Sequence, residues 1–323
     1  MAHELTTHAD GRVEFAYLQS DGEPWHGLGQ ALPDQATVDQ WREAAGMDWQ
    51  IKRSRVRFGE GDTQQIWDDQ HVLFRSDTKA PLGIVSPGYQ IVQPAQVVEF
   101  FRDIVKAGGL ELSAAGTIFG GKRFWATAKI GEASPAAVQD KVGGYLLITS
   151  SADGSLATEV RRTTIRAVCK NTVAMAFADA KASVKVSHRS VFDPAQVKEF
   201  MELNTAAWAA FKHQIASLAN TDILAEQAEL ITAEVFANSS APSALDKARE
   251  SAGYAKVLSL FNGEGKGAKL DGVYGTAWGL LNAFTEYSDH HVRARSDENR
   301  FVSAQWGPGA SLKDRALQTL IAV

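Results

Sequence analysis

Three short stretches of the chain carry cations in patterns that could bind a run of phosphates. In the first, WQIKRSRVRF over residues 49–58, arginines occupy positions 53, 55 and 57. Successive residues of a strand point to opposite faces, so Arg53, Arg55 and Arg57 would share one face at a pitch of about 6.6 Å. Like charges at this spacing repel one another unless an anion lies across them. Carboxylates nearby in the sequence, at 60–69, are the alternative partners.

The second stretch follows an Asp-Gly turn at Ala152–Gly154, a strong signal for a β-hairpin. Its second strand should place Arg162, Thr164 and Arg166 on one face, with Arg161 beside them in the sequence. Such a face would offer guanidinium and hydroxyl donors to phosphates. The competing interpretation is that these arginines pair with carboxylates elsewhere on the sheet.

The third stretch is the second half of another expected hairpin, KRFWATAK over 122–129. Here Arg123 and Trp125 share a face, and an aromatic ring beside a cation can stack on an unpaired base. A Trp on a sheet is more often buried than exposed, so core packing is the alternative. The candidate nucleic-acid-binding residues are therefore Arg53, Arg55, Arg57, Lys122, Arg123, Trp125, Arg161, Arg162, Arg166 and Lys170.

Beyond these candidate binding stretches, we find no motif that indicates catalysis. The loop NGEGKG over 262–267 resembles a phosphate loop, but neither Ser nor Thr follows Lys266 and both flanks read as helix. His290 and His291 lack further ligands at zinc spacing, and the single Cys169 cannot build a thiolate site. We expect no enzymatic activity, no cofactor and no metal. A nuclease built from scattered carboxylates is a weaker alternative.

The bulk composition is that of an ordinary globular protein. The chain has 323 residues, 45% of them hydrophobic, and a net charge of -5, which argues against a generally basic DNA-coating protein. One cysteine excludes an intrachain disulfide and fits a reducing cytosol. The N-terminus lacks a secretory signal, and no apolar run is long enough to span a membrane. We therefore expect a cytoplasmic protein.

The elements that must position these residues change along the chain from strands to helices. Residues 1–34 read as an irregular arm, 35–192 as an α+β core that would bind nucleic acid, and 193–323 as a helical region. The order predicts the α+β class, with antiparallel hairpins and one or two packed helices in the first half. Predicted strands cover 49–58, 65–74, 82–92, 111–119, 122–130, 145–150, 156–167 and 184–191. Predicted helices cover 37–45, a segment from Pro94 to Gly108, 170–179, 194–220, 221–237, 243–261, 273–290 and 312–322.

Three pieces of the sequence carry a resemblance to a known family. They are PWHGLG over 24–29, IRAVCKNT over 165–172, and Gly275-Thr276 together with NAFTEY over 282–287. With these pieces the chain resembles the phage/plasmid-like protein family, domain of unknown function 932. The resemblance implies a protein carried by phages, prophages or plasmids and acting in the cytoplasm of a bacterial host.

At the level of fold, the expected strand–hairpin–helix core is similar to single-strand annealing proteins, both the Rad-type ring formers and the phage RecT and Red-beta proteins. This likeness implies an ATP-independent protein that binds and anneals single-stranded DNA in homologous recombination. It would assemble as a homo-oligomeric ring or filament. The alternative is a non-enzymatic interaction protein of a mobile element, acting in host takeover or defence, whose arginines meet a protein partner.

Overall fold

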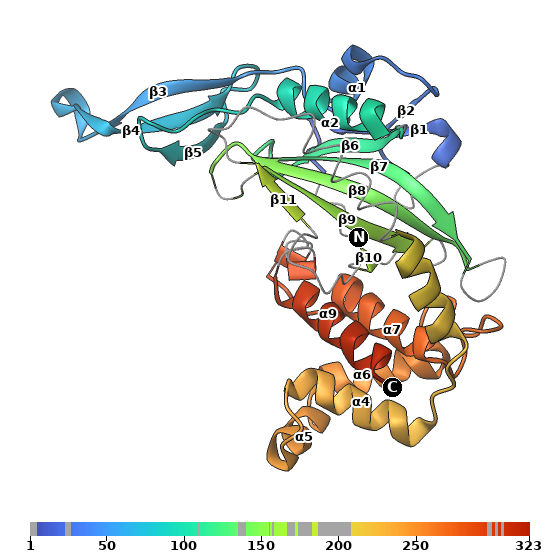
Figure 1. The fold of residues 1–323 in the computed structure, drawn as a ribbon. Coiled ribbons are helices and arrows are strands. Elements are labelled where there is room, and N and C mark those ends of the chain that lie inside the picture. The colour runs from blue at the N-terminus through green and yellow to red at the C-terminus, as the bar shows by residue number, and fades with distance from the viewer. Residues whose placement is uncertain are drawn as a thin grey trace.

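The α+β class is confirmed in a computed structural model of the chain, with strands in the first half and helices in the second (Figure 1). The structure describes residues 5–22, 27–108, 110–134, 140–154, 156, 158–166, 172–173, 183–186, 208–295, 299–300, 303–304 and 307–323. Within these ranges the strands form two sheets, one of eight strands and one of three.

The large sheet has the strand order β10-β9-β8-β7-β6-β1-β2, and β11 pairs with β9. All its pairs are antiparallel except the parallel pair of β1 and β2. The predicted central hairpin is confirmed as β8–β9, and Gly154 in its turn has the positive φ, 74°, that glycine adopts without strain. The strands are β1 (Phe15–Leu18), β2 (Gln30–Leu32), β6 (Leu112–Ile118), β7 (Arg123–Ala133), β8 (Val142–Ser151), β9 (Thr158–Arg166), β10 (Thr172–Val173) and β11 (Ser183–Val186).

Two sequence-based expectations are wrong here. Residues 1–34 are not simply an irregular arm, because β1 and β2 belong to the large sheet and β1 lies between β6 and β2. The short apolar run of β1 buries Phe15 and Leu18, which outweighs the glycines and prolines around it. The helix predicted over 170–179 is contradicted at Thr172–Val173, two β-branched residues that form β10. Trp25, His26 and Cys169 lie outside the described residues.

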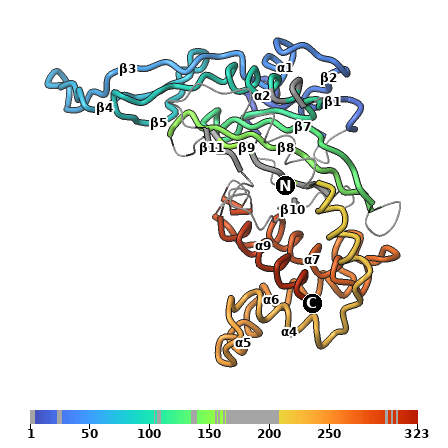
Figure 2. The backbone as a smooth tube through the Cα atoms, viewed as in Figure 1, coloured from blue at the N-terminus to red at the C-terminus, as the bar shows by residue number. Residues whose placement is uncertain are grey.

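The small sheet has the antiparallel order β3-β4-β5, formed by β3 (Ile51–Phe58), β4 (Gln65–Arg75) and β5 (Pro81–Val85). Since β5 pairs only with residues 71–74 of β4, the outer part of β3 and β4 continues as a two-stranded ribbon. It projects away from the rest of the protein (Figures 1 and 2). We call β3, β4 and the loop between them, residues 51–75, the ribbon. The strand predicted over 82–92 ends at Val85, just before Pro87, which has no N–H for pairing.

Two helices pack on the large sheet and form the first core. They are α1 (Val38–Ala44) and α2 (Pro94–Gly108) (Figure 1). Thr37 caps α1, because its hydroxyl accepts from the Gln40 N–H at 3.3 Å while the Gln40 side chain accepts from the Thr37 N–H at 2.7 Å. Phe101 of α2 joins Phe124 of β7 and Leu146 of β8 in this core. Burying each such side chain stabilises the fold by about 1.5–3 kcal/mol.

The second half builds a separate helical core around Trp278, Phe284 and Leu317, all fully buried. The helix predicted over 243–261 is interrupted, because the Ser251 side chain caps a new helix by accepting from the Tyr254 N–H at 3.1 Å. The helical elements are residues 208–219, α4 (Ala225–Ala237), α5 (Pro242–Arg249), α6 (Ala252–Ser259), a π-helical turn Leu260–Glu264, α7 (Ala277–Glu286), a second π-helical turn Tyr287–His291, and α9 (Pro308–Ile321).

Trp208 joins the helical half to the large sheet. Its ring lies so close to Gly131 and Gly144 that a Cβ added at either glycine would come within 2.7 Å or 2.5 Å of it. No helix of the described chain is long and apolar enough to cross a membrane.

Candidate nucleic-acid interface

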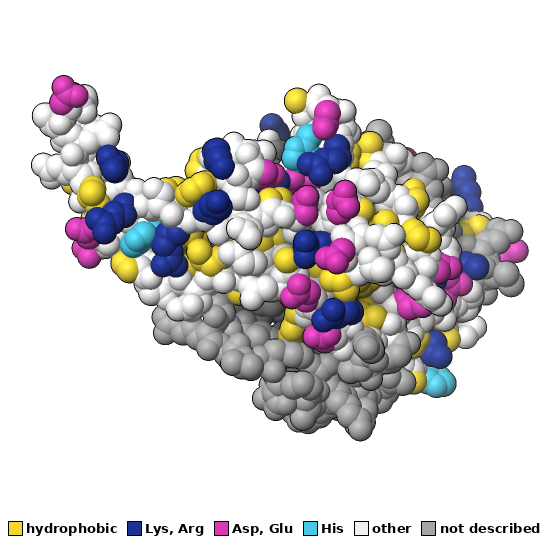
Figure 3. All heavy atoms as spheres, turned by 90° about the horizontal axis from the view of Figure 1, so that it is seen from above, with side chains coloured by type: hydrophobic (Ala, Val, Ile, Leu, Met, Phe, Trp, Pro, Cys, Tyr) yellow, Lys and Arg dark blue, Asp and Glu magenta, His cyan; other side chains and the backbone are white. Residues whose placement is uncertain are grey.

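The ribbon carries the first group of predicted cations. In the β3–β4 register Arg53 pairs with Leu73, Arg55 with His71 and Arg57 with Ile66. All three arginines and Lys52 are exposed, and the space-filling view shows Lys and Arg side chains spread along the ribbon (Figure 3). Although these cations belong to one strand, their surroundings differ.

Arg53 is used within the fold. Its Nη1 donates to the carbonyl oxygen of Pro87 at 3.1 Å, and its Nη2 donates to that of Tyr89 at 2.5 Å. These bonds tie β3 to the segment that follows β5. We therefore assign Arg53 mainly to holding the small sheet together.

Within the part of the chain that the structure describes, the Arg55 side chain has only one weak partner. Its Nη1 lies 3.8 Å from Oδ1 of Asp68, and the two side chains are 64% and 80% exposed. An ion pair this open contributes about 0–1 kcal/mol, because water and salt screen it. Asp68 lies in the bulge where residues 68–70 separate the partner of Arg55 from the partner of Val56. The Arg55 guanidinium therefore keeps most of its surface open to solvent.

The side chains of Arg57 and Lys52 have neither a hydrogen bond nor an ion pair with any residue that the structure describes. The predicted alternative, neutralisation by the carboxylates of 60–69, is thus met at ion-pair distance only for Arg55 within the described chain. Glu60 and Asp62 lie in the loop at the end of the ribbon and are exposed. The ribbon consequently has a cationic strand and an acidic tip (Figure 3).

Two large aromatic side chains of the ribbon were not among the sequence candidates. Phe58 is 52% exposed and Trp67 is 47% exposed. Trp67 pairs with Val56, and Phe58 pairs with Gln65. Trp67 lies between Ile66 and Asp68, so the sequence has no clean alternation there to say whether the ring is buried. No signal in the sequence indicated this exposure, because the strand predicted over 82–92 was long enough to cover the strand predicted over 65–74.

The β7 candidates are placed differently. Lys122 is exposed in the turn before β7, and the Arg123 guanidinium lies 5.2 Å from the centroid of the Phe119 ring. Trp125 is half-buried and packs against Phe15, with ring centroids 5.6 Å apart. Trp125 is therefore part of the aromatic packing between β7 and β1 more than an open stacking surface.

The β9 candidates occupy strand positions of both parities. Arg162 pairs with Leu146, which belongs to the core under α2, whereas Arg161 pairs with Leu147. Because Leu147 pairs with Thr127, position 161 shares its face with Trp125, and position 162 has the opposite face. Arg166, whose partner is Val142, has the same parity as Arg162. The side chains of these three arginines, and all of Lys170, lie outside the described residues.

The three candidate stretches do not belong to one sheet. Strand β3 belongs to a different sheet from β7 and β9, and the register gives positions 125 and 161 one parity and positions 162 and 166 the other. Parity within a strand could be read from the sequence, but the register between strands could not. A shift of one residue exchanges the two faces.

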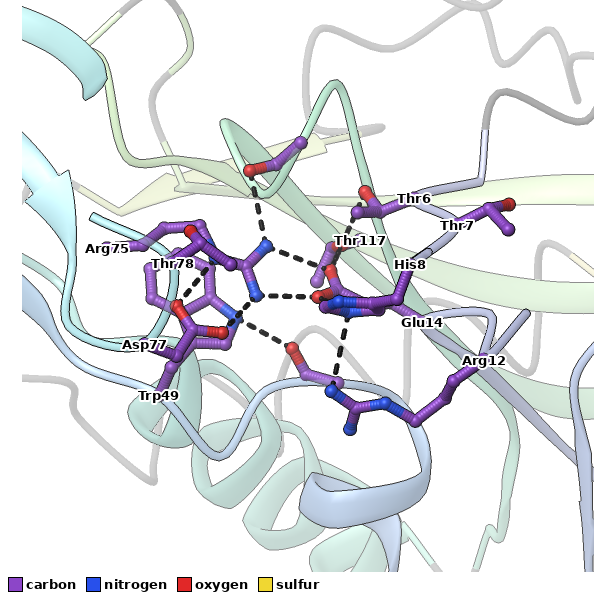
Figure 4. Close-up of polar contacts among 12 residues, drawn as sticks. Thr6, Thr7, His8, Arg12, Glu14, Trp49, Arg75, Asp77, Thr78 and Thr117 are labelled. Carbon is purple, nitrogen blue, oxygen red and sulfur yellow. Dashed lines mark hydrogen bonds and ion pairs between the residues drawn. The ribbon is translucent and has the colours of Figure 1, made fainter. Parts of the chain in front are cut away.

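A buried ion cluster lies at the base of the ribbon (Figure 4). Arg75, with 2% of its side chain exposed, donates from Nη2 to Oε1 of Glu14 at 2.6 Å and from Nη1 to Oε2 at 3.2 Å. It also donates to Asp77 from Nε at 3.0 Å and from Nη2 at 2.7 Å, and to the carbonyl of Gly120 at 3.2 Å. Every N–H group of its guanidinium thus has a partner.

Further contacts close this cluster. The Arg75 guanidinium lies 4.1 Å from the centroid of the Trp49 ring, and the Glu14 carboxylate also bonds the hydroxyl of Thr117 and Nε2 of His8, the latter at 2.7 Å. Burial acts to raise the pKa of Asp77, but hydrogen bonds from Arg75 and the Thr78 backbone outweigh it and lower that pKa to about 2. We assign this cluster to fastening the ribbon to the N-terminal segment and the β6–β7 turn.

The glycine-rich loop of the helical half binds a carboxylate of the chain itself. The backbone N–H of Lys266 donates to Oε2 of Glu286 at 2.9 Å. Nearby, Nζ of Lys313 lies 2.8 Å from Oδ1 of Asp289, and both side chains are buried. Burial lowers the pKa of His290. Among the residues that the structure describes, no group of three or more His, Cys, Asp or Glu side chains could hold a metal ion.

Fold and surface together define an α+β protein with a projecting ribbon that exposes cations and aromatic rings. The family model described as Domain of unknown function (DUF932) matches residues 81–306, so the chain belongs to the DUF932 family. No curated protein and no solved structure matches the chain. The matched range starts at the first residue of β5, so β3 and β4 precede it.

Proposed function

We propose that this protein binds single-stranded DNA through the ribbon and acts as an ATP-independent annealing protein of a phage or other mobile element, in homologous recombination. The observation that carries the proposal is the exposure of Lys52, Arg55 and Arg57 on a strand that projects from the body. Cations held away from the acidic body can approach phosphates although the chain has a net charge of -5.

A site made of Lys52, Arg55 and Arg57 alone still suits annealing. Contacts to phosphate hold a strand without reading its sequence and leave base edges free to pair. Three phosphate contacts from one ribbon give weak binding, with a salt slope of about -2 on logarithmic axes for a single strand. A homo-oligomeric ring or filament would repeat the ribbon along one strand and multiply this affinity. Lys122 and Arg123 would add contacts only if the strand leaves the ribbon toward β7.

The test is fluorescence anisotropy of a dye-labelled oligothymidylate at increasing salt. The triple variant K52A/R55A/R57A should bind about tenfold or more weakly than the parent at low salt and should lose most of the salt slope. The matched control is R102A, which removes an exposed arginine of α2 that lies outside the ribbon. Absence of binding by the parent protein at low salt would refute the proposal.

Annealing and assembly need separate measurements. The parent protein should speed the pairing of two complementary oligonucleotides without ATP, and light scattering should report a mass of many chains when DNA is present. The alternative function is docking of a protein partner on the small sheet, which the exposure of Ile66 on the ribbon and Ile84 on β5 favours. A monomer that does not bind DNA would support that alternative.

A further inference from the structure

The exposed aromatic rings of the ribbon need an explanation beyond phosphate binding. Within the described chain neither Phe58 nor Trp67 contacts another aromatic ring, and about half of each side chain is open to solvent, 52% and 47%. Large aromatic side chains in soluble proteins usually bury most of their surface. Rings left open on a projecting element are therefore candidates to contact a ligand.

Their spacing suits a flat ring. The pairs Val56–Trp67 and Phe58–Gln65 make Trp67 and Phe58 diagonal neighbours on one face of the ribbon. Diagonal neighbours lie about 7–8 Å apart, with their Cβ atoms somewhat closer. Stacked bases repeat about every 3.4 Å, so a base held between two rings needs a gap of roughly twice that value.

The charges nearby select an anionic occupant. Arg57 is adjacent to Phe58 in β3 and therefore has the opposite parity, so the ribbon carries this cation on the face opposite to the rings. Lys52 has the parity of Phe58 but is six residues away, about 20 Å along the strand. Cations interleaved with aromatic rings are the combination that binds single strands, since the phosphates meet the cations and the bases meet the rings. In a duplex the faces of the bases are inside the stack, so only an unpaired strand can contact both the cations and the rings.

A second copy of the chain fits this surface less well. Strand β3 is an edge strand, and two β3 strands paired antiparallel about Arg55 would place Arg53 of each opposite Arg57 of the other. Charged residues on an edge strand are a common way of preventing such pairing.

We propose that Phe58 and Trp67 form a stacking site for an unpaired base, so that the ribbon binds the bases as well as the phosphates of a single strand. This proposal rests on the proposed function and specifies its ligand. Stacking occupies the face of a base and leaves its pairing edge open, so a strand held in this way can still meet its complement.

The test compares two labelled oligonucleotides of equal length, an oligothymidylate and an abasic strand with the same number of phosphates. W67A and F58A should each weaken binding to the oligothymidylate about tenfold and change binding to the abasic strand less than twofold. R57A should weaken both by the same factor. I84A is the matched control, because it removes an exposed apolar side chain of the same sheet that cannot stack.

The outcomes separate the two proposals. If the parent binds neither strand at low salt, the proposed function fails. If the parent binds both but W67A behaves like the parent, or I84A loses as much as W67A, only the stacking site is refuted. A fall in the mass of W67A with unchanged DNA affinity would assign the rings to a second copy and also refute it. Should circular dichroism show that W67A is unfolded, W67F against W67L decides, because only the phenyl ring restores stacking.

Discussion

Arg75 and Arg55 lie in paired strands of one small sheet, yet they have opposite environments. The side chain of Arg75 is 2% exposed and all its N–H groups are bonded, whereas that of Arg55 is 64% exposed and meets one carboxylate at 3.8 Å. A buried guanidinium must be fully paired, because an unpaired buried charge costs several kcal/mol. An exposed one keeps its hydration and remains available. Arg75 therefore stabilises the base of the ribbon, whereas Arg55 contributes little to stability and stays exposed.

The largest effect on stability should follow replacement of the buried arginine, Arg75. R75A leaves the Glu14 carboxylate buried without its main partner, and we expect a loss of about 3–5 kcal/mol in the free energy of unfolding. Urea unfolding followed by circular dichroism measures it. R55A should change the same quantity by less than about 0.5 kcal/mol. Equal effects of the two substitutions would contradict the distinction between the buried and the exposed arginine.

Two adjacent glycines allow a test of how tightly the Arg75 cluster is packed. Gly120 and Gly121 both have positive φ, 67° and 88°, so both substitutions to Ala strain the backbone. Only at Gly121 would the new Cβ also meet other atoms, the Trp49 ring at 2.6 Å and Nη1 of Arg75 at 2.7 Å. We expect G121A to destabilise the protein by about 1–3 kcal/mol more than G120A in thermal or urea unfolding. Similar losses for both would mean that the cluster adjusts freely.

Acid should affect the base of the ribbon through Asp77. Its pKa falls from 3.8 to about 2 on folding, so the folded state binds protons less readily than the unfolded state. The stabilisation is complete above the unfolded pKa and is lost as pH falls from about 4 to about 2. D77N should therefore lower stability at neutral pH and flatten the decline over this range, measured by urea midpoints at several pH values. If the stability of D77N falls over this pH range as steeply as that of the parent, other carboxylates dominate the acid unfolding.

The smallest effect on stability should come from the exposed ion pair. D68N removes the partner of Arg55 and should change the free energy of unfolding by less than about 0.5 kcal/mol. If the proposed function holds, it should strengthen DNA binding at low salt by a small factor, because a competing carboxylate is gone. Anisotropy with the labelled oligothymidylate measures this change. Weaker binding would indicate that Asp68 positions Arg55 for its ligand.

Local features of this protein could be predicted from the sequence because neighbouring residues decide them. Thr37 caps α1, Pro94 opens α2, and Asp153-Gly154 turns the central hairpin. The exposure of the β3 cations was also foreseeable in part, since alternating arginines rarely enter a core. Each of these depends on contacts within a few residues.

Only the tertiary structure determined which of these pieces meet. Glu14 and Arg75 are 61 positions apart, and neither was a candidate until the fold paired them. The register that separates Arg162 from Trp125, and the short β5 that leaves Phe58 and Trp67 uncovered, depend on strands pairing at a distance. Side-chain types and their alternation are local properties of the chain, whereas burial and shared faces are set by packing between distant segments.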